Sequence, residues 1–292
     1  YLESEYTAAK KREKPSENIS VGIDLLYGGG EYNHSYAERT GLTEPVWPKG
    51  REPLGVVADE YGKRKFPETL GGATLQSENF FAVVLSSFGI CRNVDRLNDL
   101  KIDNPPSSWE DLADEKLFGS IGLADPTKSG SVAKAFEIIV YSQMMKNAIA
   151  SGYQPDEIRR IEAAVAAGQK APDGYERTLD EGGRKGIWLL QDIGANAKYF
   201  TASSDKIPAD VANGLTAAGV CIDFYGRAQA AQSIRADGRT SMEFSVPLGE
   251  AGVTADTVSI LKGAPHRKLA ERFVEYSLSE AGQKLWYLPP GS

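Results

Sequence analysis

Histidine and cysteine are scarce in this sequence, with 2 of each among 292 residues. A zinc finger, an iron–sulfur site or a disulfide-stabilised scaffold needs more of these side chains than the chain contains. A Ser–His–Asp triad would have to use His34 or His266, and the sequence has neither a GxSxG nucleophile elbow nor an HExxH motif. These absences argue against an enzyme.

An excess of positive charge and a long hydrophobic run are also missing. The 33 basic and 40 acidic residues leave a net charge of −7, which argues against a nucleic-acid partner because phosphates would not be neutralised. The longest uncharged, apolar-rich run covers residues 79–91 and is shorter than the ~20 residues of a membrane-spanning helix. The first residues (YLESE) are charged and helical in character, unlike a signal peptide.

What remains has the composition of a globular protein. Hydrophobic residues make up 41% and charged residues 25% of a chain long enough for one large or two medium domains. Segments with strand patterns alternate with helical ones, which predicts an α/β architecture with largely parallel sheets in two lobes. Residues 41–75 are expected to form loops with short strands. The expected strands are residues 21–27, 79–92, 121–124, 216–225, 242–246 and 256–261. The clearest predicted helices are residues 31–40, the segment after Ser131 and a final helix that begins at Pro265. Leu269, Phe273 and Leu285 are expected to form the buried side of this final helix.

A glycine triplet follows the first predicted strand. Tyr27 ends that strand, and Gly28, Gly29 and Gly30 lead into a predicted helix. Glycines at this place allow backbone N–H groups to approach an anion at the positive end of the helix. A plain tight turn is the simpler interpretation, since neither GxGxxG nor GxxxxGK[ST] is present.

A second candidate loop precedes the amphipathic helix after Ser131. Thr127, Ser129, Gly130 and Ser131 bring hydroxyls and backbone donors to a helix start, a suitable cradle for a phosphate, a carboxylate or a sugar hydroxyl. The alternative is that Ser129 or Ser131 only caps the helix, and one residue can do both.

Asp223 and Tyr225 form the third candidate site. They stand two apart at the end of the predicted strand 216–225, so they are expected to point the same way. Asp223 would then bind an amine, a hydroxyl or a metal, although an aspartate that accepts hydrogen bonds in a turn is the simpler alternative.

Other side chains are expected to be structural. Cys91 and Cys221 each lie in a predicted buried strand and are interpreted as small core residues, with a disulfide open if the strands are neighbours in an oxidising compartment. Trp188 is assigned to the core in preference to a stacking wall for a ligand.

These motifs together resemble the solute-binding proteins of bacterial ABC importers, in the branch that binds ferric iron, sugar phosphates and phosphonates. The resemblance spans most of the chain, and the closing helix is its most specific part. The similar pieces occur in the family's order and are residues 23–29 (IDLLYGG), 88–93 (FGICRN), 106–112 (PSSWEDL), 117–126 with 129–131 (LFGSIGLADP and SGS), and 263–283 (from GAP to SEAGQ).

The resemblance implies a type II binding-protein fold of two α/β lobes hinged by two chain crossings. Lobe one would comprise residues 1–85 and 229–292, and lobe two residues 86–228. A small anionic or polyhydroxylated solute would bind between the closing lobes, without a cofactor or a metal. We therefore expect a non-enzymatic, monomeric protein in the periplasm or another extracytoplasmic space, either free or lipid-anchored, whose partners are this solute and a membrane permease.

Two departures from the family pattern keep alternatives open. The family normally begins with a leader and a strand that contacts ligand, whereas this sequence starts in a predicted helix, so we expect a missing N-terminal segment. Many ferric-iron binders carry two adjacent tyrosines where this chain has residues 223–226 (DFYG), which leaves ferric iron as the alternative ligand. A sensor ectodomain with the same binding chemistry is a further possibility.

Overall fold

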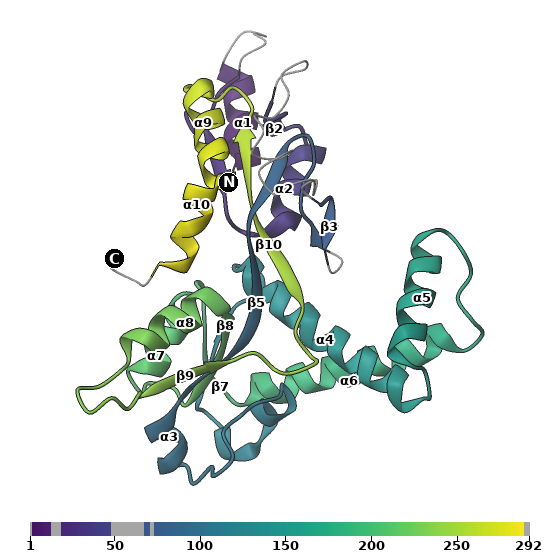
Figure 1. The fold of residues 1–292 in the computed structure, drawn as a ribbon, viewed down its shortest axis with the longest axis vertical. Coiled ribbons are helices and arrows are strands. Elements are labelled where there is room, and N and C mark those ends of the chain that lie inside the picture. The colour runs from purple at the N-terminus through teal and green to yellow at the C-terminus, as the bar shows by residue number, and fades with distance from the viewer. Residues whose placement is uncertain (1, 13–18, 48–66, 71–72, 289–292) are drawn as a thin grey trace. The chain divides into compact units, whose positions relative to one another are not determined.

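The computed structural model describes residues 2–12, 19–47, 67–70 and 73–288. The chain divides into two compact units (Figure 1). Unit 1 comprises Tyr1–Ser86 and Val253–Ser292, and unit 2 comprises Ser87–Gly252. The chain therefore passes between the units twice, as the predicted fold class requires.

The second crossing lies later in the chain than predicted. Residues 229–252 were expected in lobe one, but they belong to unit 2. Strand β9 (Met242–Ser245) pairs with the unit 2 part of β5 (Phe80–Asn93), with Ile90 opposite Ser245. The Ser87 hydroxyl also donates to the carbonyl of Gly252 at 3.0 Å, which joins the two ends of unit 2.

Unit 1 is built around β10 (Val253–Leu261), whose residues from Thr254 to Leu261 are buried apart from Asp256. Strand β10 pairs antiparallel with β1 (Leu25–Tyr27) and with β2 (Thr43–Glu44). β1 is shorter than the predicted strand 21–27. The other elements of unit 1 are the first part of β5, the short hairpin of β3 (Thr69–Leu70) and β4 (Ala73–Thr74), helices α1 (Leu2–Arg12), α2 (Gly30–Arg39), α9 (Arg267–Leu278) and α10 (Glu280–Lys284), and the 3₁₀ turn Leu285–Tyr287.

The core of unit 1 uses a different face of α9 from the predicted one. Leu269, Phe273 and Leu285 were expected to be buried, yet all three are exposed. The helix instead buries Ala270, Val274 and Leu278 against strand residues that include Phe81, Val258 and Ile260. Of the predicted loop-rich stretch 41–75, residues 48–66 and 71–72 lie outside the described residues, and β2 to β4 lie in the remainder.

Unit 2 contains a mixed sheet, not the largely parallel one that the sequence predicted. The strand order is β5–β8–β6–β7, and β5 also pairs with β9. Strand β6 (Ile121–Ala124) is parallel to β7 (Ala197–Thr201) and to β8 (Ala218–Ile222), but β5 is antiparallel to β8 and β9. The helices of unit 2 are α3 (Val94–Asp99), α4 (Gly130–Ala150), α5 (Pro155–Ala166), α6 (Tyr175–Ala195), α7 (Lys206–Ala212) and α8 (Asp223–Gln232), with 3₁₀ turns at Glu110–Ala113 and Glu115–Leu117.

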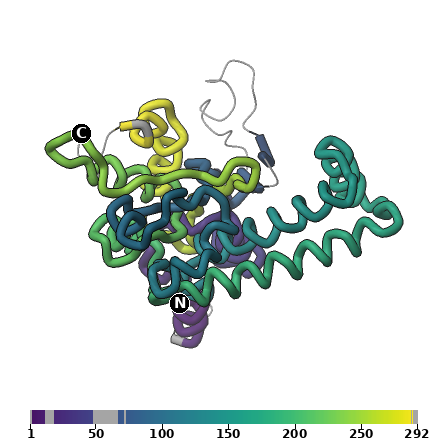
Figure 2. The backbone as a smooth tube through the Cα atoms, turned by 90° about the horizontal axis from the view of Figure 1, so that it is seen from below, coloured from purple at the N-terminus to yellow at the C-terminus, as the bar shows by residue number. Residues whose placement is uncertain are grey.

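Helices α4 and α6 lie side by side as an antiparallel pair, with α5 at their far end (Figure 2). Two glycines of α6 allow this close approach. A Cβ added at Gly182 would lie 2.5 Å from the Cα of Met144, and one added at Gly186 would lie 2.6 Å from the Cα of Val140. Side chains of any size at these positions would push the helices apart.

Candidate functional site

The glycine loop of unit 1 connects β1 to α2. Gly28, Gly29 and Gly30 have φ angles of +77°, +88° and +79°, a region that side chains with a Cβ rarely adopt. The N–H of Gly28 donates to the carbonyl of Thr257 at 2.8 Å. The N–H groups of Gly29 and Gly30 both donate to Oδ1 of Asp256, at 3.1 and 3.2 Å. The three donors that the sequence predicted for a ligand anion are therefore already bonded within the protein, two of them to one carboxylate.

His34 holds this loop from inside unit 1. Its side chain is fully buried, with Nε2 at 2.9 Å from the Gly28 carbonyl and Nδ1 at 2.6 Å from Oγ of Ser259. Burial lowers the pKa of His34, and the Gly28 hydrogen bond only partly opposes this effect. A neutral imidazole satisfies both contacts, because Nε2–H donates to the carbonyl while Nδ1 accepts from the Ser259 hydroxyl.

Tyr27 stands beside the loop and is 47% exposed. Its ring packs edge-on against Phe273 at 5.6 Å between centroids. Partial burial and the nearby charge of Asp256 raise the pKa of the Tyr27 hydroxyl, so that it stays protonated at neutral pH. It can therefore donate a hydrogen bond.

The second predicted loop connects β6 to α4. Oδ1 of Asp125 accepts from the N–H of Thr127 at 2.9 Å and from its hydroxyl at 2.6 Å, and these bonds lower the pKa of Asp125. Ser129 is the N-cap of α4, and its Oγ accepts from the N–H of Val132 at 3.4 Å. The capping interpretation of Ser129 is thus correct, and its own O–H proton remains available to a ligand.

The first turn of α4 also offers backbone donors. Within the described part of the chain, the N–H groups of Gly130 and Ser131 donate to no acceptor. The start of α4 is therefore a set of convergent donors at the positive end of a long helix.

The third predicted pair, Asp223 and Tyr225, does not lie on a strand. Strand β8 ends at Ile222, and α8 begins at Asp223. Two residues on a helix are about 200° apart around its axis, so the two side chains do not point the same way as predicted. The error arises because the apolar run of the strand continues into the first turn of the helix.

Asp223 is nonetheless partly buried at the first position of α8, where backbone N–H groups reach its carboxylate. Its Oδ1 accepts from the N–H of Phe224 at 2.9 Å, and the Ser87 backbone also donates to the carboxylate. Burial raises the pKa of Asp223 despite these bonds and the nearby charge of Arg227. Tyr225 is 41% exposed, and its ring contacts that of Phe224.

The fold brings two of the three predicted groups to one edge of the unit 2 sheet. Strands β6 and β8 are parallel neighbours, with Ile121 opposite Ala218. The loop of residues 125–131 follows β6, and Asp223 follows β8, so both stand at the carboxyl ends of adjacent parallel strands, where α/β proteins bind ligands. The glycine loop belongs to unit 1.

Sequence reasoning missed Asp256, which contacts the glycine loop, and Ser259, which contacts His34. A signal was present for Asp256, which is the single charged residue of the otherwise apolar or hydroxylic segment 253–261 (VTADTVSIL). An acidic side chain in a buried strand needs donors, and the loop supplies them.

Cys91 and Cys221 are both buried and free. They lie on the neighbouring strands β5 and β8, and Sγ of Cys91 donates to the carbonyl of Gly219 at 3.3 Å. A hydrogen bond between the two thiols and burial raise the pKa of Cys221 well above its usual value. The thiols belong to a small core cluster with Ile207, Val211 and Met242.

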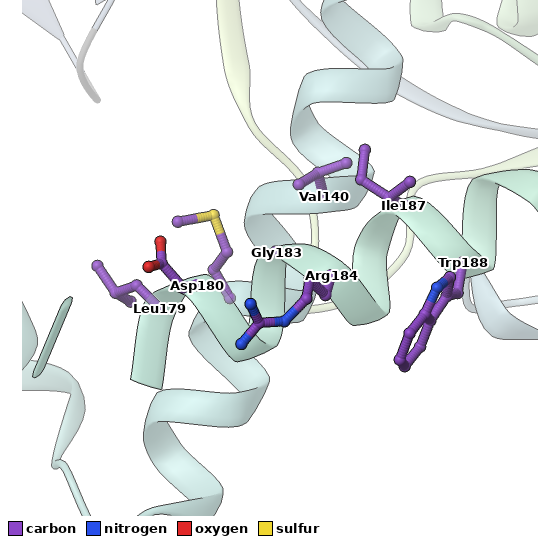
Figure 3. A pocket seen from close by; sticks show the side chains of 8 residues that line it. Val140, Leu179, Asp180, Gly183, Arg184, Ile187 and Trp188 are labelled. Carbon is purple, nitrogen blue, oxygen red and sulfur yellow. The ribbon is translucent and has the colours of Figure 1, made fainter. Parts of the chain in front are cut away.

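A cavity of about 370 Å³ lies on the helix pair of α4 and α6 (Figure 3). Trp188 lines it and is 61% exposed, so its predicted place in the core is wrong. The core side of α6 uses Ile193 and glycines instead. The other lining residues, none of which was predicted to contact ligand, are Val140, Met144, Leu179, Asp180, Gly183, Arg184 and Ile187.

The described residues contain no cluster of three or more His, Cys, Asp or Glu side chains that could hold a metal ion. None of the helices described here has the length and hydrophobicity needed to cross a membrane.

Comparison with curated proteins identifies a relative along most of the chain. An uncharacterized protein of Haemophilus influenzae is 25% identical over 271 residues, which are 92% of this chain and 62% of that protein. The chain thus spans less than two thirds of the length of this curated relative.

Solved structures share the fold. The periplasmic binding protein AfuA of Actinobacillus pleuropneumoniae, solved with fructose 6-phosphate, has a TM-score of 0.65 at 23% identity, over 97% of this chain and 69% of that chain. Iron-bound HitA of Pseudomonas aeruginosa has a TM-score of 0.54 at 17% identity, over 98% of this chain and 71% of that chain. These similarities confirm the predicted two-lobe binding-protein fold.

The family comparison assigns the class of protein. The sequence profile of the bacterial extracellular solute-binding proteins matches residues 58–288, which is more than half of the chain. Solute-binding proteins are not enzymes, which agrees with the class expected from the residues. The chain belongs to the family of bacterial extracellular solute-binding proteins.

Proposed function

We propose that the protein captures a small anionic, polyhydroxylated solute between its two units and delivers it to the membrane permease of an ABC importer. The protein would act as a monomer in the periplasm or a similar extracytoplasmic space, free or lipid-anchored. The observation that carries the proposal is the start of α4, where the N–H groups of Gly130 and Ser131 and the hydroxyl of Ser129 are available to an anion.

The other predicted residues would contact the rest of the solute. Asp223 would accept from a hydroxyl or an amine at the same sheet edge, next to Tyr225. Tyr27 and the Gly28–Gly30 loop would supply the contacts of unit 1. Sugar phosphates combine an anionic group with hydroxyls, and the structure most similar in fold among those compared above was solved with such a ligand.

The energetics require several of these contacts at once. A micromolar dissociation constant corresponds to about −8 kcal/mol, and one charge-assisted hydrogen bond contributes about 1.5–3 kcal/mol. The donors at the start of α4 are therefore too few by themselves, and further contacts to the ligand from both units are needed. Closure of the units on a ligand would provide these contacts.

Titration calorimetry with fructose 6-phosphate tests the proposal. We expect micromolar binding by the unmodified chain, and at least tenfold weaker binding when Ser129 and Ser131 are both changed to alanine, since both hydroxyl donors are lost while the N–H groups of residues 130 and 131 remain. Ser279→Ala is the matched control, because Ser279 is also an N-cap, its Oγ accepting from Gly282 N–H at 3.2 Å, but it caps α10 in unit 1. Equal affinity of the double variant and the control would refute the anion site.

Native mass spectrometry of the purified protein separates this proposal from the ferric-iron alternative. A small organic mass that leaves on denaturation supports the proposal, whereas an excess mass equal to one iron supports the alternative.

A further inference from the structure

The two predicted ligand loops differ in what their backbone donors already bind. In unit 2, the N–H groups of Gly130 and Ser131 donate to no acceptor in the described part of the chain. In unit 1, the N–H groups of Gly29 and Gly30 both donate to the Asp256 carboxylate. The same local pattern, a strand followed by a glycine-containing loop and a helix, thus presents donors without an acceptor in unit 2 and donors already bonded to a carboxylate in unit 1.

The position of Asp256 is built into the unit 1 fold. The residue lies on β10 among buried neighbours, and the Gly28 N–H bond to the Thr257 carbonyl holds the loop against the same strand. His34 fixes the other side of the loop through the Gly28 carbonyl and Ser259. The glycine donors are therefore held toward the carboxylate by contacts on both sides.

A second carboxylate lies beside the loop. Glu31 directly follows the loop, and its Oε2 accepts from the hydroxyl of Thr254, two residues before Asp256. An anion that approached Gly29 and Gly30 would have to displace the Asp256 carboxylate from these two donors.

We propose that Asp256 is a specificity-determining residue whose carboxylate prevents the Gly28–Gly30 loop from binding anions. An anionic solute then places its charged group on the α4 loop of unit 2 and turns its uncharged or hydroxylated part toward unit 1. This orientation rests on the proposed function, but the exclusion of anions from the glycine loop is a property of unit 1 and can be measured separately.

The experiment follows backbone amide signals of the full chain labelled with ¹⁵N-glycine while inorganic phosphate is added. In the unmodified protein, we expect the Gly29 and Gly30 signals to stay in place. In Asp256→Ala, both signals should shift in a saturable manner as phosphate is added. The apparent dissociation constant for phosphate should be at least tenfold lower than any measured at these signals in the unmodified protein. Asp256→Ser serves as a second variant if the alanine variant does not fold, because its short side chain also removes the charge.

The control variant is Asp173→Ala, which removes one negative charge from a side chain of unit 2 that is 97% exposed. It should leave the Gly29 and Gly30 signals insensitive to phosphate. Phosphate shifts at Gly29 and Gly30 in the unmodified protein would overturn the inference, and so would their absence in a folded Asp256 variant. The Gly130 signal reports on the proposed anion site independently, so its failure to move would count against the proposed function and not against the role of Asp256.

Discussion

Single residues decide the chemistry of the unit 1 loop. The triplet Gly28–Gly30 predicts a backbone that can approach an anion, but Asp256, more than two hundred positions away, occupies the donors. His34 contacts the same loop from within the unit through the Gly28 carbonyl, and its other ring nitrogen is bonded to Ser259. A buried polar group must be satisfied by some partner, and which partner it finds is a matter of the fold.

His34 predicts a pH dependence of stability. Burial lowers the pKa of His34 in the folded state. The unfolded chain then binds a proton below about pH 6.5 that the folded chain does not bind, so stability is complete above this pH and falls as the pH drops toward the folded pKa. We expect a loss on the order of 1 kcal/mol, measured by urea unfolding between pH 7.5 and 5.5.

The variant His34→Gln should be less stable at pH 7.5 but should lose this part of the pH dependence. A proton NMR titration provides the direct check, because the His34 ring signal should keep its neutral position to a lower pH than a free imidazole. The prediction would be contradicted if the free energy of unfolding changed with pH by the same amount in the variant and in the unmodified chain.

At the scale of elements, the antiparallel pair α4–α6 depends on glycines that face α4. A Cβ at Gly186 would lie 2.6 Å from Val140 Cα, whereas one at Gly183 would lie 3.8 Å from the Met144 side chain. The first distance requires the helices to separate, and the second is an ordinary contact.

The substitution Gly186→Ala should therefore destabilise the protein by about 1–3 kcal/mol through overpacking. Gly183→Ala is the matched control on the neighbouring turn of the same helix, and it should be neutral or stabilising by up to about 1 kcal/mol, because alanine is the better helix former. Urea unfolding of both variants measures the difference. If Gly183→Ala proved the more harmful change, this account of the helix packing would be wrong.

At the scale of the whole molecule, the proposed function requires that one ligand contacts both units. Hydrogen exchange measured by mass spectrometry with and without fructose 6-phosphate should then show slower exchange in peptides that cover residues 27–30 and residues 127–131. Peptides from α5, which carries none of the proposed ligand residues, should not change. Protection confined to one unit would show that the ligand does not bridge the two.

Local sequence patterns determined the elements and the class of protein. Alternation of apolar runs with amphipathic segments predicted α/β units, and residues 79–92 were correctly interpreted as a long buried strand, since 14 residues form β5. The motifs around residues 106–131 and 263–283 indicated the family that the profile match confirms. These features depend on neighbouring residues, which the sequence shows directly.

Tertiary structure alone decided the features that depend on contacts between distant residues. The place of residues 229–252 follows from the pairing of β9 with β5, and the buried face of α9 follows from the strands it meets. The apolar run that ends at Tyr225 did not show that the strand stops at Ile222, because strand and helix share the same hydrophobic residues there. Above all, only the fold brings the Asp256 carboxylate to the Gly29 and Gly30 donors, because a hydrogen bond depends on distance in space and not on position along the chain.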